Sequence, residues 1–173
     1  MAAPVVVGIG DAAVSADPDS ELVTYALGSC VAVVAWDPRA RAGGLVHYML
    51  PLSVLDARRA ESRPFMYCDT GLPLLLERLY GLGAKKERLV LRAAGGAQVL
   101  DENGIFNIGR KNEQILRQIL AGFRLHLDEE NFGGAVSRSV GLEVATGRFW
   151  LREYPVTMTQ RTADTGSAVG REQ

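Results

Sequence analysis

Cys30 is the residue of this chain best suited to act as a nucleophile. It stands in the segment Leu27-Gly28-Ser29-Cys30, between two runs of strand-forming residues. Gly28 permits a tight turn, and a thiol at such a turn is held by rigid flanks while its tip stays accessible. Free cysteines are also among the most buried residue types, so a packed and unreactive Cys30 is the commoner reading of this local sequence.

Two histidines are available as a base for this thiol. His47 interrupts an apolar run from Gly43 to Pro51, where a core strand has little reason to carry an imidazole. The alternative is a partly buried histidine that only makes structural hydrogen bonds. His126 alternates with Arg124 and Asp128, which predicts a solvated surface position. His47 is therefore the candidate base.

A hairpin would bring Cys30 and His47 to the same end of one sheet. If Asp37-Pro38-Arg39-Ala40 closes a tight hairpin as a type I turn, the two residues pair directly, with Cβ atoms about 4.5–5.5 Å apart. A longer loop from Asp37 to Gly43 instead pairs Cys30 with Leu50, about 10 Å from His47 along the strand. The sequence leaves both registers open.

Neighbouring residues supply further candidates for this site. Thr24, on the strand that enters the turn, could fix which imidazole nitrogen faces the thiol, although threonine is also simply a good strand former. Ser29 is a weaker nucleophile candidate than Cys30, because no G-x-S-x-G motif surrounds it. Backbone N–H groups in the turn formed by Gly28 and Ser29 are candidate donors to an oxyanion.

The composition excludes several classes of protein. The chain has 173 residues, 47% hydrophobic and 23% charged, which is ordinary for one soluble domain. A formal net charge of −1 provides no basic field for nucleic acid or an anionic membrane, and no apolar run is long enough to insert into a membrane. The cysteines and histidines lack zinc-site spacing, so we expect no metal and no cofactor. Two cysteines and the absence of a signal-peptide pattern predict free thiols and a cytoplasmic location.

Strands gather at both ends of the sequence, around two amphipathic helices. Apolar stripes predict helices around Leu72–Leu79 and Ile115–Phe123. This order favours an α+β fold with mixed or antiparallel sheets and helices packed outside, whereas a doubly wound nucleotide fold lacks its glycine-rich or Walker motif. Strands are expected at 22–26, 31–36, 44–50, 88–92, 140–144 and 148–154, the last two as a hairpin.

Segment boundaries follow from capping residues and composition. Asp69 or Thr70 is the expected N-cap of the first helix, and Asn107 or Asn112 that of the second. We expect one domain over residues 1–156. Residues 157–173 are polar and without apolar periodicity, which predicts a disordered tail.

Several motifs in this order resemble the CheD family, the chemoreceptor glutamine deamidases of bacterial chemotaxis. The resemblance extends from about Gly8 to Tyr154 and covers most of the chain. The motifs that carry it are Leu27-Gly28-Ser29-Cys30-Val31, Asp37-Pro38, Gly43-Gly44-Leu45-Val46-His47-Tyr48-Met49-Leu50-Pro51, Tyr67-Cys68-Asp69, Gly95-Gly96-Ala97, Ile108-Gly109-Arg110-Lys111-Asn112 and Gly133-Gly134.

The resemblance implies a fold, an activity and a set of site residues. The fold would be a β-sandwich-like core with flanking helices, similar to cysteine-dependent toxin deamidases. The catalytic cysteine, histidine and threonine would be Cys30, His47 and Thr24. The substrates would be glutamine side chains in the cytoplasmic helices of methyl-accepting chemotaxis receptors, converted to glutamate with release of ammonia. A CheC-type phosphatase is an implied partner, and Cys68 departs from the small residue expected at its position.

The implied chemistry is a thiol mechanism. Cys30 attacks the carboxamide carbon while His47 accepts the thiol proton. A histidine partner can lower a cysteine pKa from about 8.5 to about 3.5–7.5. Alkylation at mildly acidic pH would therefore distinguish an accessible, low-pKa Cys30, which reacts quickly, from a buried one, which does not. A methyl ester could follow the same acyl route. The alternative function is a non-catalytic adaptor that binds chemoreceptors or a CheC-type phosphatase, with Cys30 packed and unreactive.

Overall fold

The computed structural model of this protein describes residues 2–98 and 107–156. The predicted disordered tail, residues 157–173, lies outside the described residues. In chain order the elements are β1 Val5–Val6, β2 Asp11–Ser15, β3 Glu21–Leu27, β4 Val31–Asp37, β5 Ala42–Tyr48, η1 Ser53–Leu55, α1 Ala57–Ser62, η2 Pro64–Met66, α2 Cys68–Gly81, η3 Lys86–Arg88, β6 Val90–Gly95, α3 Ile108–Gly122, β7 Glu129–Phe132, β8 Val136–Glu143 and β9 Arg148–Pro155.

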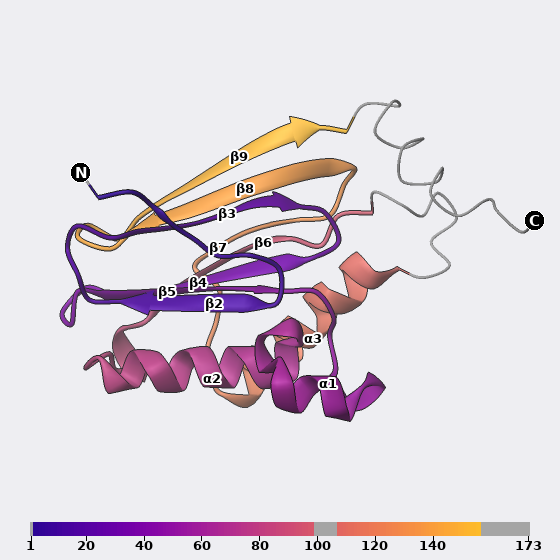
Figure 1. The fold of residues 1–173 in the computed structure, drawn as a ribbon, viewed down its shortest axis with the longest axis horizontal. Helices are drawn as coiled ribbons and strands as arrows, with labels where there is room; N and C mark the ends of the chain where they lie inside the picture. The colour runs from indigo at the N-terminus through magenta and orange to yellow at the C-terminus, as the bar shows by residue number, and fades with distance from the viewer. Residues whose placement is uncertain (1, 99–106, 157–173) are drawn as a thin grey trace, which may run out of the picture.

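The elements form three layers (Figure 1). A four-stranded sheet has the order β1-β3-β8-β9, and a five-stranded sheet has the order β2-β5-β4-β6-β7. The two sheets face each other, and α1, α2 and α3 cover the other face of the five-stranded sheet (Figure 1). Both sheets mix parallel and antiparallel pairs. The prediction of an α+β fold with a sandwich-like core and flanking helices is confirmed.

Strand β4 lies at the centre of the five-stranded sheet and is buried on both faces. Ala32 and Val34 pack into the core between the two sheets, while Val31, Val33 and Ala35 pack against the helical layer. This explains why residues 31–36 of β4 are continuously apolar rather than alternating. The strand therefore has rigid surroundings along its whole length, and it positions the residues at both of its ends.

The two predicted helices are present, and the N-cap position is as predicted for the second helix but not for the first. The stripe around Leu72–Leu79 lies in α2 and is buried, as is much of the stripe of α3. Helix α2 begins at Cys68 rather than after Asp69 or Thr70, because the Asp69 carboxylate instead accepts hydrogen bonds from Ser53 N at 2.9 Å and Ser53 Oγ at 2.8 Å. Asn107 is the N-cap residue of α3, one of the two predicted, with a positive φ of 39° and without a side-chain capping hydrogen bond.

The hairpin between β4 and β5 has neither of the two predicted registers. Asp37 pairs with Ala42, so the connecting loop consists of residues 38–41, and Arg41 adopts a positive φ of 51°. The Asp37 carboxylate accepts hydrogen bonds from Arg39 N at 2.8 Å and Ala40 N at 3.0 Å, which stabilises the first half of the loop. One residue in the left-handed conformation lengthens the loop beyond a tight turn and shifts the register.

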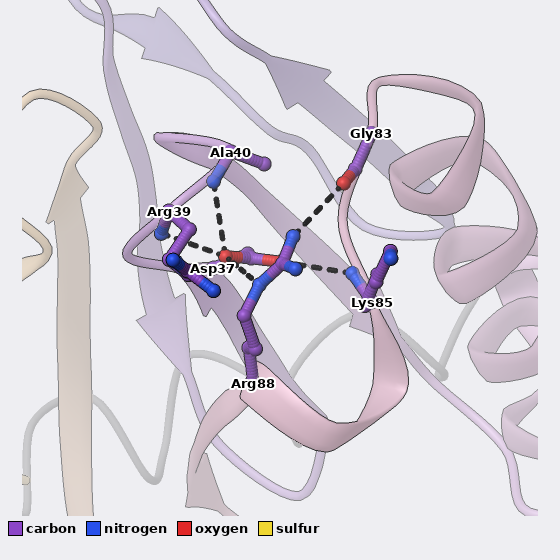
Figure 2. A network of polar contacts seen from close by, with 6 residues as sticks. All are labelled: Asp37, Arg39, Ala40, Gly83, Lys85 and Arg88. Carbon is purple, nitrogen blue, oxygen red and sulfur yellow. Dashed lines mark hydrogen bonds and ion pairs between the residues drawn. The ribbon is translucent and has the colours of Figure 1, made fainter.

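Asp37 also attaches this hairpin to the segment after α2 (Figure 2). Its carboxylate, which is fully buried, accepts hydrogen bonds from Lys85 N at 2.8 Å and from Arg88 Nε at 3.0 Å. Burial alone would raise the pKa of Asp37, but the hydrogen bonds from Arg88, Ala40, Lys85 and Arg39 outweigh it and hold the pKa well below its ordinary value. This end of β4 is therefore a satisfied ionic network.

Candidate active site

Cys30 lies in the turn that carries the chain from one sheet to the other. Strand β3 belongs to the four-stranded sheet and β4 to the five-stranded sheet, and residues 28–30 connect them. The pairing of β3 with β8 shifts register between Thr24 and Leu27, and Ala26 has a positive φ of 56° there. Such a bulge bends the strand and redirects it. Cys30 itself is half-buried and packs against the core between the sheets.

A hydrogen bond between Thr24 and His47 joins the two sheets. Thr24 Oγ1 lies 2.8 Å from His47 Nδ1, and each residue is 1% exposed. The same hydroxyl donates to the carbonyl oxygen of Val7 at 2.6 Å. A threonine hydroxyl has one hydrogen and a carbonyl can only accept, so Thr24 Oγ1 must accept the hydrogen of Nδ1. The neutral His47 ring therefore carries its basic lone pair on Nε2.

Cys30 and His47 lie on the same side of the five-stranded sheet. His47 pairs with Ala32 of β4, and Cys30 is two residues before Ala32. Residues two apart along a strand share a face, and diagonal neighbours in an antiparallel pair have Cβ atoms about 7–8 Å apart or less. Within the described residues, His47 Nε2 has no hydrogen-bond partner. The structure thus brings together Cys30, His47 and Thr24 at one end of the space between the sheets.

Burial favours the neutral forms of both Cys30 and His47. It raises the pKa of the Cys30 thiol to about 11, an effect that the residue's own backbone N–H partly offsets. Burial also lowers the pKa of His47 to about 4. The shift of the Cys30 pKa is therefore opposite to the lowering that a histidine partner could produce, because the thiol is partly buried between the sheets.

The carbonyl groups of the turn are anchored, and its amide groups are not. The carbonyl oxygens of residues 28, 29 and 30 accept hydrogen bonds from Ala97 N, Asn112 Nδ2 and Gly96 N, respectively, each at 2.9 Å. A planar trans peptide directs its N–H opposite to its C=O, so the amides that follow residues 28 and 29 point away from these anchors. Among hydrogen bonds within the described residues, these two N–H groups donate to no other residue.

The Gly95-Gly96 motif allows the anchoring loop to approach the turn. Gly95 has a positive φ of 125°, and a Cβ at this position would overlap the carbonyl oxygen of Cys30. Arg138, which is 3% exposed, supports the other side of the loop by donating to the carbonyl oxygens of Gly95 at 3.3 Å and Gly133 at 2.8 Å. A glycine is thus required where the backbone of β6 meets the candidate nucleophile.

The remaining cysteine and histidine lie away from this arrangement. The side chain of His126 is 84% exposed, which confirms the predicted surface position. Cys68 is fully buried, and burial raises the pKa of its thiol to about 12. Within residues 2–98 and 107–156, no three or more His, Cys, Asp and Glu side chains gather in a way that could hold a metal ion.

Sequence reasoning missed two residues that hold this site, Asn112 and Arg138. From the sequence, Asn112 is a candidate helix cap and the last residue of one motif, without a predicted role at the site, yet it is fully buried inside α3. It lies one helical turn before Leu116 on the apolar stripe of that helix, and a polar residue on an apolar stripe is the signal that could have identified it. Arg138 lies within β8 and carries no comparable signal in its local sequence.

Comparison with known proteins identifies the family. The family model described as CheD chemotactic sensory transduction matches residues 49–153. The chain is 49% identical over 144 residues to a protein of Anaeromyxobacter dehalogenans named probable chemoreceptor glutamine deamidase CheD 2, an alignment that covers 83% of this chain and 91% of the relative. This protein belongs to the CheD family, as its motifs predicted.

Two further relatives have similar extents of alignment. A protein of Solibacter usitatus named probable chemoreceptor glutamine deamidase CheD is 45% identical over 149 residues, which cover 86% of this chain and 88% of the relative. The chemoreceptor glutamine deamidase CheD of Thermotoga maritima is 40% identical over 148 residues, covering 86% and 90%, respectively. No helix in the described part of the chain is long and apolar enough to cross a membrane.

Proposed function

We propose that this protein is a hydrolase that deamidates glutamine side chains of chemoreceptors, with Cys30 as nucleophile, His47 as base and Thr24 as the residue that orients the imidazole. The observation that carries the mechanism is the Thr24–His47 hydrogen bond, which leaves the basic Nε2 on the side of the sheet where Cys30 lies. The names of the relatives support the substrate class.

In the first half-reaction the thiol and the glutamine carboxamide form a tetrahedral intermediate. Because the thiol and the imidazole are both neutral at rest, the proton moves from Cys30 Sγ to His47 Nε2 as the carbon–sulfur bond forms. The N–H groups of Ser29 and Cys30 donate to the developing oxyanion, and loss of one such donor typically costs about 10²–10³ in rate. Nε2 then returns the proton to the departing nitrogen, which leaves as ammonia.

In the second half-reaction water hydrolyses the resulting thioester. His47 Nε2 accepts a proton from the attacking water, the carbon–sulfur bond breaks, and the proton passes to the Cys30 sulfur. The products are glutamate, ammonia and the free thiol. A methyl ester would follow the same route, with the proton from Nε2 passing to the departing oxygen and methanol leaving, since resonance stabilises an ester carbonyl less than an amide carbonyl.

A second candidate function is a non-catalytic adaptor, and the raised pKa of the Cys30 thiol is the observation that favours it. A structural cysteine has no need of a base, however, whereas here a buried imidazole has its Nδ1 fixed and its Nε2 without a partner among the described residues. An unpaired buried nitrogen is costly unless it has a role. We therefore favour the enzyme.

The proposal includes a location and partners. We place the protein in the cytoplasm, with the cytoplasmic helices of methyl-accepting chemotaxis receptors as substrates and a CheC-type phosphatase as a binding partner. Both cysteines are free thiols in the structure, which fits a reducing compartment. The proposed catalytic domain spans residues 1–156.

The decisive experiment incubates the protein with a chemoreceptor cytoplasmic fragment and follows both released ammonia and the fragment's mass. We expect stoichiometric ammonia and, at specific glutamines, the mass increase for exchange of an NH2 group for OH. A methyl-esterified fragment, incubated in parallel, tests whether the protein also hydrolyses methyl esters. Binding of the fragment without ammonia release or any mass change would support the adaptor instead.

A further inference from the structure

Asn112 connects the turn that carries Cys30 to the chain that follows His47. Its side-chain nitrogen Nδ2 donates to the carbonyl oxygen of Ser29 at 2.9 Å and to the carbonyl oxygen of Met49 at 3.0 Å. Ser29 directly precedes Cys30, and Met49 is two residues after His47. One buried amide group from α3 is thus bonded to both segments that hold the candidate reacting groups.

The chemistry of these contacts requires an amide donor at this position. Both partners are carbonyl oxygens, which can only accept, so the two hydrogens of Nδ2 must face them. The other amide atom, Oδ1, is buried without a hydrogen-bond partner among the described residues. A buried unpaired acceptor is destabilising, so a merely space-filling role would be met better by an apolar side chain such as leucine.

Helix α3 is fixed closely enough to transmit this constraint. Gly109 in its first turn packs so tightly on the 95–97 loop that a Cβ there would overlap the carbonyl oxygens of Gly96 and Ala97. The hydroxyl of Tyr48, next to His47, donates to the backbone oxygen of Asn112 at 2.8 Å. Helix α3 therefore packs against the 95–97 loop at its start and is hydrogen-bonded to β5 at the residue after His47.

We propose that Asn112 is a positioning residue for the reaction: it sets the separation and alignment of Cys30 and His47 by fixing the carbonyls of Ser29 and Met49, and it keeps the N–H of Cys30 aimed at the oxyanion. The Cys30 peptide links the Ser29 carbonyl to the Cys30 N–H in one rigid plane, so holding the carbonyl orients the donor. This inference rests on the proposed deamidation but adds a residue outside the Cys30–His47–Thr24 set.

Three variants separate positioning from packing. Asn112→Asp keeps the shape of the side chain but replaces the hydrogen-bond donor with an acceptor. Asn112→Leu keeps a similar volume and has neither a donor nor an acceptor. Leu116→Ala is the matched control, because Leu116 is fully buried one turn further along the same helix and bonds to neither segment. We expect kcat on the receptor fragment to fall about 30- to 100-fold in both Asn112 variants with KM within about threefold, because a misplacement near 1 Å costs about 10² in rate. Leu116→Ala should lower the Tm and retain kcat within about threefold of the parent chain.

Thiol labelling gives a readout that does not depend on the substrate. With iodoacetamide under native conditions, loosening of the turn should increase labelling of Cys30 in the Asn112 variants, while the buried Cys68 stays unlabelled; global unfolding would label both. An Asn112 variant that keeps kcat within about threefold, or a Leu116→Ala variant that loses as much kcat as they do, overturns the inference. If the parent chain itself releases no ammonia, the proposed function fails, and unchanged Cys30 labelling across the variants would then separately refute the role of Asn112.

Discussion

Buried polar groups have opposite environments at the two ends of strand β4: one is ionised and fully hydrogen-bonded, whereas the others are neutral and incompletely hydrogen-bonded. At the hairpin end, the buried carboxylate of Asp37 accepts bonds from three backbone N–H groups and from Arg88, which holds its pKa low and the group ionised. At the other end, burial raises the pKa of Cys30 and lowers that of His47, so both groups stay neutral, and Nε2 has no partner among the described residues.

This difference separates stability from reactivity along a single strand. Removal of a fully paired ion from the interior destabilises the protein. All of its hydrogen-bonding positions are already occupied, so none is free to bind a substrate. The neutral thiol and the imidazole, with its Nε2 open among the described residues, are poorly satisfied in the free protein, and under the proposed mechanism a bound carboxamide would provide the missing polar partner. Substitutions at the two ends should therefore affect different measurements.

Replacing the sulfur should produce the largest effect of all. Cys30→Ala should reduce ammonia release by at least about 10³-fold, because the covalent route is lost. Stability should change by less than about 1 kcal/mol, since only one half-buried sulfur is removed. Ammonia assays and urea unfolding measure the two quantities.

Cys68→Ala is the control for this substitution, because it removes the other thiol from a fully buried position. We expect it to lower stability and leave the rate within about threefold of the parent chain, since a cavity in the core costs packing but not chemistry. Equal activity of Cys30→Ala and the parent would rule out the thiol mechanism.

A substitution at the hairpin end of β4 should lower stability and leave the rate nearly unchanged. Asp37→Ala leaves Arg88 and three backbone donors without their acceptor, and removing one partner of a buried ion pair costs about 3–5 kcal/mol. The residual kcat, measured at a temperature where the variant stays folded, should be within about threefold of the parent value. Asp19→Ala, at an exposed aspartate, should change stability by less than about 0.5 kcal/mol. A large loss of kcat in folded Asp37→Ala would show that the two ends are coupled.

As the pH falls, protonation of His47 should lower the stability first, and protonation of Asp37 should lower it only at more acidic pH. The folded pKa of His47 is about 4 against about 6.5 in the unfolded chain, so the unfolded state binds more protons and stability falls as the pH drops from 6.5 towards 4. The loss between pH 7 and pH 5 should be about 2 kcal/mol. The folded pKa of Asp37 is depressed, so its contribution is lost only below its ordinary pKa of about 3.9.

Urea unfolding at a series of pH values measures this order. His47→Gln should flatten the upper part of the curve between pH 6.5 and pH 4 and leave the lower part unchanged. An unaltered slope in His47→Gln would mean that this imidazole is not the group that resists protonation.

The sequence predicted the parts of this comparison that depend on local patterns. The continuous apolar run of β4, the stripes of α2 and α3, and the placing of Cys30 and His47 near one end of a sheet all follow from periodicity and turn residues. The family resemblance was confirmed as well. These features are encoded by residues close together in the chain.

Features that depend on residues far apart could not be predicted in the same way. The register of the hairpin depends on Arg41 adopting a left-handed conformation, for which the loop composition gives no strong signal. Asp69 bonds to Ser53 instead of capping α2. The direction of the pKa shift of Cys30 depends on its burial against the second sheet, and sequence motifs do not report burial.

The smallest expected effect is the loss of the hydrogen bond that orients His47. Thr24→Val keeps the shape of the side chain but removes the acceptor for Nδ1–H and the donor to Val7. The imidazole can then place its proton on Nε2, the nitrogen that must accept the proton from the thiol, so we expect kcat to fall about tenfold with little change in KM. Thr24→Ser keeps the hydroxyl and should retain most of the activity. Since His47 also becomes easier to reorient, the valine variant should lose more activity than the serine variant at every pH; equal rates would mean that the threonine serves only to join the two sheets.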